Sequence, residues 1–429
     1  MSDKIVVIGG GISGISAGYH LKEKGYDATV YEKDSEWGGL CGNFTINGFR
    51  FDKSVHLSFA KSEYVQDLFK KSTDHQINIH KPEAFNYYEG AWVRHPAQNN
   101  LFPLPTEVKV AAINDFVENL SVEHKEVNNY DEWLRAQFGN YFSENFPIKY
   151  TRKYWTVEAK ELSTTWCGVR WYRPSIEEVL RGSFTNETPN TYYAKEMRYP
   201  KYGGYKNFLT HMAKNCNIAV NKEVNTINPV TKVVNFKDGT KQDYQDLISS
   251  APLPELIDML PDVPQVVKDA SEKLYATTVN IISLGFNKAD IPEHLWYYIY
   301  DEDFFPARCY SPSIKSLDNA PEGKSSVQFE VYASRHKDFP MDPNKLMEDI
   351  ITKGIKMGLF KEEEIIVKDS RILPYGNVVF YNGMERDRKV VKDYIESLGI
   401  HLIGRFGQWE YHWTDQSLLT GKAIVDKHF

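Results

Sequence analysis

The first forty residues alternate between apolar runs and one helical segment. The run at 4–8 (KIVVI) leads into a glycine-rich turn at 9–14 (GGGISG), and a second apolar run at 28–32 (ATVYE) follows the helical segment. Short apolar runs bounded by glycine are typical of buried strands. The pattern therefore predicts a strand, a tight turn, a helix and a second strand at the start of the chain.

In later segments, the spacing of apolar residues changes between helical and alternating patterns. Residues 106–182 are poor in glycine and carry apolar residues at helical spacing, which predicts a helical insertion (Val108, Ala111, Ile113, Phe116, Val117, Leu120). Alternating patterns dominate 256–394, where 279–286 and 326–332 are the clearest strands, and a mainly antiparallel sheet is expected there. An apolar run at 247–252 suits a return of the chain to the unit formed by the first forty residues. The helix from about Asp415, which follows 404–407, suits a second return.

These patterns predict an α/β fold with three units. The first is a discontinuous Rossmann-like dinucleotide-binding domain made of 1–85, 200–255 and 395–429. The second is the helical domain at 106–182, and the third is an antiparallel-sheet substrate domain made of 86–105, 183–199 and 256–394. Ligand sites favour the junctions between domains, so we expect the site where these units meet.

Composition narrows the function classes. The chain has 429 residues and a formal net charge of −7, which argues against nucleic acid or an anionic membrane as a general partner. Its start leaves no room for a signal peptide, and no apolar run reaches the length of a membrane span, so we expect a cytoplasmic protein. Four widely spaced cysteines suggest neither a zinc site nor a disulfide framework, and we expect them reduced and buried, with no metal (Cys41, Cys167, Cys216, Cys309).

The glycine turn has the Gly-x-Gly-x-x-Gly pattern of a dinucleotide site, formed by Gly9, Gly11 and Gly14. Backbone N–H groups of such a turn, together with the N-terminus of the helix that it opens, can face a pyrophosphate. Glu32 ends the second apolar run, where a carboxylate can accept the ribose hydroxyls. Strand, turn, helix, strand and acid occur in this order within about 30 residues, as the motif requires. An ordinary glycine-rich turn is the structural alternative.

A glycine pair, Gly38 and Gly39, follows this acid closely. It permits a second close backbone approach to the same pyrophosphate. A Glu followed by such a pair resembles the FAD site of flavoproteins of the amine-oxidase and glutathione-reductase kind. The resemblance implies FAD, and NAD is the alternative cofactor.

Several segments, spread over nearly the full chain, resemble the UDP-galactopyranose mutases, flavoenzymes that interconvert the six-membered and five-membered ring forms of UDP-galactose. The similarity lies in 92–100 (WVRHPAQNN), in 154–170, and in 404–411 (GRFGQWEY), together with Arg308 and the segment 51–59 that carries His56. This family belongs to the wider amine oxidase and protoporphyrinogen oxidase superfamily of flavoproteins.

The resemblance implies roles for individual residues. Catalytic positions are Arg170 and Arg308, which would bind the diphosphate, His56 beside the flavin, and Tyr411 on the pyrophosphate. Substrate contacts would come from Trp155, His95, Gln98 and Phe59. The cofactor would be bound by the turn and by residues that follow it (Gly9, Gly11, Ser13, Gly14, Glu32, Lys33, Gly39, Leu40, Val224, Arg405, Asp415, Gln416). The helix that starts near Asp415, with Thr414 or Asp415 as its N-cap, would direct its positive end at the flavin.

The chain also departs from the family pattern. Ser54 and Val55 stand where the family has two glycines before the histidine, and Lys315 stands where a tyrosine is expected. Asp415 and Thr151 each replace an asparagine, and Ala97 replaces an aromatic residue. These departures leave the sugar and the nucleotide open.

In the reaction that the resemblance implies, N5 of reduced FAD attacks the anomeric carbon of a UDP-hexose, UDP leaves, and the sugar recloses through a different hydroxyl. The reaction has no net redox change, needs an external reductant such as NAD(P)H, and would supply furanose units to a surface polysaccharide. Fixed guanidinium groups and phenols suit the departing diphosphate. A homodimer is a further expectation.

Other interpretations of the same residues remain open. His56 and the large aromatic residues could be core residues, and the arginines could be partners of surface ion pairs. An oxidase or desaturase of the amine-oxidase type shares the N-terminal signature, but it needs an apolar cavity over the flavin and no diphosphate-binding arginines. A binding protein with a structural flavin is the non-enzymatic alternative.

Overall fold

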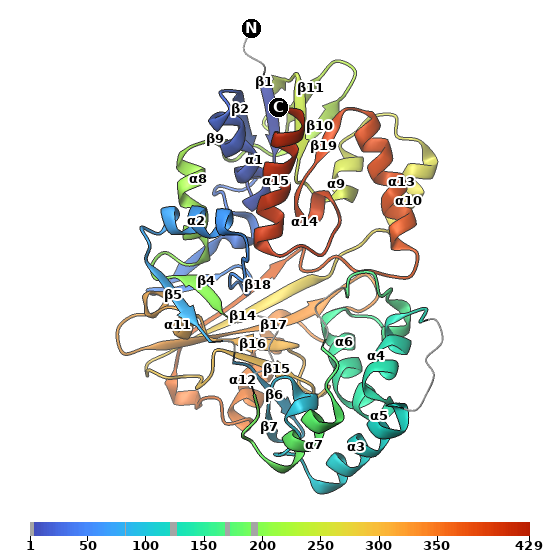
Figure 1. The fold of residues 1–429 in the computed structure, drawn as a ribbon. Coiled ribbons are helices and arrows are strands. Elements are labelled where there is room, and N and C mark those ends of the chain that lie inside the picture. Colours follow the sequence, from blue (N-terminus) through green and yellow to red (C-terminus); the bar gives the residue numbers. More distant parts are fainter. Residues whose placement is uncertain (1–3, 82, 121–126, 168–171, 190–195) are drawn as a thin grey trace.

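A computed structural model describes residues 4–81, 83–120, 127–167, 172–189 and 196–429. Its first sheet is parallel, with the strand order β19-β13-β1-β2-β9 (Figure 1). The strands are β1 (Lys4–Ile8), β2 (Asp27–Tyr31), β9 (Asn217–Ala219), β13 (Asp246–Ser249) and β19 (Ile400–Leu402). Three separated stretches of chain thus contribute to one sheet, in a mixed α/β fold as the sequence predicts.

The centre of this sheet is β1, whose Val7 pairs with Val30 of β2 and with Ile248 of β13. All three side chains are fully buried, as expected for a parallel strand that is covered on both faces. Helix α1 (Ile12–Glu23) follows the glycine turn and packs against the C-terminal helix α15 (Thr414–His428). The predicted strand–turn–helix–strand unit is therefore confirmed, with Glu32 one residue beyond the end of β2.

The second sheet has seven strands in the order β18-β14-β17-β16-β15-β6-β7. Its pairs are antiparallel except for β15 with β6, which is parallel. The strands are β6 (Phe85–Tyr88), β7 (Ala91–Arg94), β14 (Thr278–Phe286), β15 (Trp296–Ile299), β16 (Arg308–Tyr310), β17 (Ser325–Ala333) and β18 (Ile365–Leu373). The mainly antiparallel sheet expected from 256–394 is present, extended at one edge by β6 and β7.

The helical insertion comprises α3 (Thr106–Leu120), α4 (Tyr130–Phe138), α5 (Asn140–Ser143), α6 (Lys149–Tyr154) and α7 (Ile176–Phe184). These helices gather at one side of the seven-stranded sheet (Figure 1). Local capping fixes where two of them begin: the Asn129 side chain accepts from the backbone of α4, and Ser175 forms a reciprocal capping box with Glu178. On α3, Phe116 is buried, whereas Val117 and Leu120 are 46% and 47% exposed, so part of its apolar pattern faces outward.

Shorter elements connect these units. They are β3 (Asn43–Ile46) with β4 (Phe49–Asp52), β5 (Ile77–His80) with β8 (Met197–Pro200), the antiparallel β10 (Val224–Asn228), β11 (Val233–Phe236) and β12 (Lys241–Asp243), and the helices α2 (Glu63–Ser72), α8 (Thr210–Lys214), α9 (Leu253–Asp258), α10 (Gln265–Lys273), α11 (Pro312–Lys315), α12 (Pro343–Lys356), α13 (Met384–Ser397) and α14 (Gly404–Gly407). All four cysteines are buried and reduced, as predicted.

Two features are absent from the residues that the structure describes. None of their helices is long and apolar enough to cross a membrane. No group of three or more potential metal ligands occurs among them either.

Candidate active site

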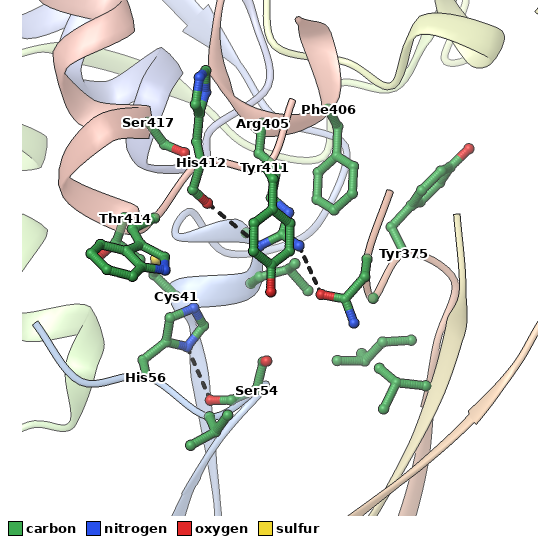
Figure 2. Close-up of a pocket in the computed structure, with 18 of the residues that line it drawn as sticks. Cys41, Ser54, His56, Tyr375, Arg405, Phe406, Tyr411, His412, Thr414 and Ser417 are labelled. Atoms are coloured by element: carbon green, nitrogen blue, oxygen red, sulfur yellow. Dashed lines mark hydrogen bonds between the residues drawn. The ribbon is translucent and has the colours of Figure 1, made fainter. Parts of the chain in front are cut away.

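One cavity of 670 Å³ extends from the glycine turn at the edge of the parallel sheet to the aromatic residues of the helical insertion. It is lined by Gly9 and Gly11 of the turn, by Tyr130 and Trp155 of the helical insertion, and by Arg308 of β16. All three structural units therefore contribute to the lining. Figure 2 shows part of this wall, where His56, Arg405 and Tyr411 lie around a common space.

The glycine turn is shaped by backbone contacts. Gly9 has a φ of +95°, and a Cβ on Gly14 would lie 1.9 Å from the Gly9 carbonyl oxygen, so neither position accepts a side chain without strain. Gly11 differs, because its φ of −75° suits any residue and a Cβ there would meet nothing within 4 Å. That open space belongs to the cavity. A phosphate could therefore approach the backbone where a side chain would otherwise stand. Ser13 also lines the cavity, whereas Gly14 supports the turn from behind.

Glu32 is buried at the end of β2 and lines the same part of the cavity. Its carboxylate accepts from the N–H of Gly10 at 2.6 Å and from the N–H of Asp34 at 2.9 Å, which fixes the carboxylate beside the turn. The Gly38 N–H donates to the Gly10 carbonyl at 2.8 Å, and a Cβ on Gly39 would lie 3.2 Å from the Gly11 Cα. The glycine pair thus packs directly on the turn. Lys33, Gly39, Leu40 and Val224 complete this end of the cavity.

These observations test whether a dinucleotide fits. The turn leaves room at Gly11, a buried carboxylate lies next to it, and the N-terminus of α1 follows immediately. This is the donor and acceptor set that a pyrophosphate and an adjoining ribose require. The residues present therefore fit a dinucleotide cofactor.

The start of α15 lies at the other side of this region. Trp413, Thr414, Asp415 and Ser417 line the cavity, and Thr414 and Ser417 are visible in Figure 2. The helix begins at Thr414, so its N-cap is Trp413 and not Thr414 or Asp415 as the sequence suggests. The reason is Gln416, whose side-chain oxygen accepts from the Trp413 N–H at 2.8 Å and closes the first turn. This contact uses the Gln416 side chain within the helix, and Gln416 is not among the residues that line the cavity. Burial raises the pKa of Asp415.

Arg405 lies on α14, at the carboxyl end of β19. Its Nη2 donates to Oδ1 of Asn377 at 2.7 Å and its Nη1 to the His412 carbonyl oxygen at 3.4 Å, the two bonds drawn in Figure 2. Its guanidinium carbon lies 4.7 Å from the centre of the Tyr411 ring. Within the described residues its Nε is buried without a hydrogen-bond partner. Arg405 therefore has hydrogen-bonding capacity left for a ligand.

Arg308 is held by a buried network. Its Nε donates to Oε2 of Glu330 on β17, and its Nη2 donates to the Tyr332 hydroxyl at 3.0 Å. The Tyr332 hydroxyl in turn donates to the same carboxylate oxygen at 2.6 Å, and the Val55 N–H donates to the other oxygen at 3.1 Å. Glu330 thus connects the candidate diphosphate-binding arginine with the loop that carries His56.

Electrostatics stabilise the charges of this pair. Burial alone would raise the pKa of Glu330, but Arg308 outweighs it and the pKa lies below its ordinary value. Burial likewise opposes the charge on Arg308, and the Glu330 carboxylate outweighs it, so the pKa of Arg308 lies well above its ordinary value. Both groups are therefore charged at neutral pH.

His56 lines the cavity between Ser54 and the start of α15. Its Nδ1 lies 3.0 Å from the Ser54 carbonyl oxygen, and because a carbonyl only accepts, Nδ1 carries the proton. Its ring stacks on Tyr205 with centres 4.9 Å apart. Burial lowers the pKa of His56 to about 4, outweighing the nearby Asp52 carboxylate. His56 is thus a neutral imidazole whose Nε2 is an acceptor at neutral pH.

The far end of the cavity is rich in aromatic residues. Trp155 is 3% exposed and lies next to Tyr411, with ring centres 5.6 Å apart. Phe59, His95 and Gln98 also line the cavity, and burial lowers the pKa of His95 to about 4. Among the described residues, ten tyrosines line the cavity as a whole (Tyr31, Tyr130, Tyr150, Tyr154, Tyr172, Tyr298, Tyr300, Tyr332, Tyr375, Tyr411). Such a wall combines apolar ring faces with many hydroxyls.

Two further positions singled out in the sequence are Arg170 and Lys315. Arg170 lies outside the described residues. Lys315, at the position where the family has a tyrosine, is fully buried and does not line the cavity. Its ammonium group lies 3.3 Å from the Asp52 carboxylate and 4.4 Å from the centre of the Tyr310 ring. This lysine is therefore an internal ion-pair partner.

Sequence reasoning missed Glu330 and Asn377. Glu330 interrupts a strand that is otherwise apolar or uncharged, and a lone carboxylate in a buried strand indicates a paired charge, so this signal was available. Asn377 follows Pro374, Tyr375 and Gly376, a composition that is typical of an ordinary turn, and it offered no signal.

Comparisons with known proteins place the chain in a family and a fold. Residues 12–349 match the family model described as flavin containing amine oxidoreductase. A solved structure of reduced UDP-galactopyranose mutase matches with a TM-score of 0.93 and 26% identity, over 99% of this chain and 95% of that one. A putative protoporphyrinogen oxidase from Exiguobacterium sp. 255-15 matches with a TM-score of 0.76 and 14% identity, over 100% of this chain and 98% of that one, which shows the shared fold.

Curated relatives match over shorter segments. A 1-hydroxycarotenoid 3,4-desaturase of Flavobacterium sp. (strain P99-3) is 33% identical over 121 residues, which cover 27% of this chain and 24% of that protein. A 4,4'-diaponeurosporene oxygenase of Staphylococcus aureus (strain USA300) is 40% identical over 113 residues, covering 23% of this chain and 22% of that protein. The chain thus aligns with about a quarter of the length of these relatives. The family model spans most of the chain, and the protein belongs to the flavin containing amine oxidoreductase family.

Proposed function

We propose that the flavin of this family is bound here as FAD. The open space at Gly11 and the buried carboxylate of Glu32 support a dinucleotide form, because they suit a pyrophosphate and a ribose. The N-terminus of α15 would direct its positive end toward the flavin ring and favour an anionic reduced form.

We further propose that the protein is a UDP-galactopyranose mutase-like enzyme, which interconverts the pyranose and furanose forms of a nucleotide sugar. The observation that carries this proposal is one continuous cavity that joins the dinucleotide turn to the Arg308 network and the tyrosine-lined wall. The solved mutase structure with similar architecture supports the same assignment. When bound, reduced FAD would supply the nucleophile for the anomeric carbon.

The residues of the chain would bind and orient the substrate. Arg308 and Tyr411 would donate to the diphosphate and stabilise the negative charge that develops as it leaves, because fixed donors in a buried site need little reorganisation. Arg170 keeps the role of a second diphosphate-binding arginine as an expectation from the sequence. Trp155 would stack on the base, and His95, Gln98 and Phe59 would line the substrate end of the cavity. Neutral His56 would accept a hydrogen bond beside the flavin through Nε2.

The test is product analysis by chromatography after the purified flavoprotein is mixed with UDP-galactofuranose, with and without dithionite. We expect UDP-galactopyranose only in the reduced sample. Absence of conversion by a fully reduced flavoprotein would contradict a mutase that acts on UDP-galactose. A matched run with NAD(P)H in place of dithionite tests the proposed physiological reductant.

A second candidate is an oxidoreductase of the desaturase or oxidase kind, favoured by the local matches to carotenoid desaturases and oxygenases. A long apolar substrate needs an apolar cavity, whereas this cavity contains the charged Arg308 and many phenols. The discriminating measurement is anaerobic mixing of the oxidised protein with a carotenoid or an amine. Bleaching of the flavin absorbance would favour this candidate over the mutase.

A further inference from the structure

Asn377 brings together the three units of the fold at one atom. It lies in the loop after β18, is 4% exposed and lines the cavity. Its Oδ1 accepts from Nη2 of Arg405 at 2.7 Å and from the Tyr154 hydroxyl at 3.0 Å. Arg405 follows the last strand of the parallel sheet, and Tyr154 ends helix α6 of the insertion.

The chemistry of these partners fixes the orientation of the amide. An arginine side chain has donors and no acceptor, so the atom of Asn377 that faces Arg405 must be the oxygen. The amide nitrogen, Nδ2, therefore points away from Arg405 with its two N–H groups. Within the described residues, no hydrogen bond of Nδ2 to the protein is present. Because Asn377 lines the cavity, these donors are available to a ligand.

The backbone holds Asn377 in place. Its N–H donates to the Thr277 hydroxyl at 2.9 Å, and its carbonyl accepts from the Thr277 N–H at 2.8 Å. The neighbouring Gly376 N–H donates to the Thr277 carbonyl at 2.6 Å. Thr277 is itself fully buried. The side-chain amide is thus attached to a rigid support, as a binding group requires.

Charge indicates what the ligand is. Arg308 is compensated by Glu330, whereas among the described residues Arg405 forms no ion pair and is oriented by the neutral Asn377 oxygen. An amide orients the guanidinium without cancelling its charge. The Tyr154 hydroxyl that bonds Asn377 lies 3.4 Å from the hydroxyl of Tyr411, the candidate pyrophosphate-binding residue. The free amide donors are thus linked through Tyr154 to a positively charged, donor-rich region that suits an oxyanion.

We propose that Asn377 is a substrate-binding residue, whose Nδ2 donates to an oxygen of the nucleotide diphosphate while its Oδ1 holds Arg405 and Tyr154 in position. This inference rests on the proposed function, because it takes the substrate to be a nucleotide diphosphate sugar. It adds a neutral, donor-presenting residue to the arginines and phenols that the sequence indicated.

The decisive variant is Asn377→Asp. A carboxylate keeps both acceptor contacts, to Arg405 and to Tyr154, but it replaces the Nδ2 donor with an acceptor and adds negative charge. If UDP contacts neither Nδ2 nor the uncompensated charge of Arg405, this variant binds UDP like the wild type. If Nδ2 donates to the diphosphate, the variant loses affinity for phosphate-bearing ligands alone. Asn377→Ala removes the donor without adding charge.

The experiment measures binding of UDP and of uridine to the oxidised holoprotein by isothermal titration calorimetry, with flavin content checked by absorbance. Asn382→Asp is the matched control, because this exposed asparagine five residues later takes the same charge change and bonds the Lys160 carbonyl. We expect UDP affinity to fall about 10- to 100-fold in both Asn377 variants, the range for a lost hydrogen bond to a charged group. Uridine affinity should change less than about twofold, as should UDP affinity in the control.

Two outcomes would overturn this inference, and they are distinguishable. Unchanged UDP affinity in Asn377→Asp, with a wild type that binds UDP, would reduce Asn377 to a positioning residue and leave the proposed function intact. A wild type that retains flavin and binds neither UDP nor uridine would contradict the proposed function itself, and this inference with it.

Discussion

Replacing Glu330 with glutamine tests whether the buried ion pair holds Arg308. The Glu330 carboxylate is 1% exposed and Arg308 is 13% exposed, so the charge that remains on Arg308 would be poorly solvated. Glutamine keeps the shape but offers one carbonyl oxygen to three donors, namely Arg308 Nε, the Tyr332 hydroxyl and the Val55 N–H. Breaking a buried pair by removing one partner costs about 3–5 kcal/mol, and we expect a loss of at least about 3 kcal/mol in the free energy of unfolding.

The assay is urea unfolding of the holoprotein, followed by tryptophan fluorescence. Glu348→Gln is the matched control, because Glu348 forms an exposed ion pair with Lys368 at 3.3 Å. Such surface pairs contribute about 0–1 kcal/mol. A double variant, Glu330→Gln with Arg308→Met, should be less destabilised than the sum of the two single variants, since it leaves no unpaired charge. A Glu330→Gln variant no less stable than the control would show that the buried carboxylate does not hold Arg308.

The same pair has a pH signature. Because the folded-state pKa of Glu330 lies below its unfolded value, its contribution is present above about pH 4.3 and is lost as the pH falls through the folded pKa. Glu330→Gln should lack this component of acid destabilisation. Unfolding measured across the acid range in both proteins would reveal the difference.

Further predictions concern the glycine turn, His56 and Trp155. Gly11→Val should fold normally but lose flavin, because the valine side chain would fill open space in the cavity. Gly14→Ala should instead destabilise the protein, because its methyl group would clash with the Gly9 carbonyl oxygen. Flavin absorbance measures the first effect, and thermal unfolding measures the second. The pKa of His56, about 4 in the folded protein, lies below its unfolded value. The free energy of unfolding should therefore fall by up to about 3 kcal/mol as the pH drops from about 6.5 to 4. In urea titrations across this range, His56→Gln should show a smaller dependence on pH. Trp155→Ala should weaken UDP binding by about 1–3 kcal/mol, because the stacking on the base is lost. Trp155→Phe should retain most of the UDP affinity. Equal UDP affinity in the two variants would count against base stacking.

Local patterns predicted the dinucleotide unit well. Its strand, turn, helix and strand are consecutive in the chain, and the cavity-lining residues Gly9, Gly11 and Glu32 lie within one short segment. Period and composition also predicted the antiparallel sheet and the helical insertion. The N-cap of α15 was missed by one residue, because the Gln416 side chain was not considered as a cap.

The remainder of the site depends on contacts that are distant in sequence. Glu330 meets Val55 across 275 positions, and Tyr154 meets Asn377 across 223, so no local pattern could pair them. Lys315 was singled out from the sequence, because the resembling family has a tyrosine of its site at this position. The structure buries Lys315 against Asp52, outside the cavity. Whether a side chain lines the cavity was decided by tertiary packing, which only the fold reveals.

In the proposed reaction, the flavin is reused and there is no net redox change. The most direct measurement is one anaerobic sample of dithionite-reduced protein, freed of excess dithionite and given UDP-galactofuranose at about 100 equivalents per flavin, in which product and flavin absorbance are recorded together. We expect conversion of many equivalents to UDP-galactopyranose while the flavin stays reduced. No product, or product that stops at about one equivalent as the flavin becomes oxidised, would contradict it.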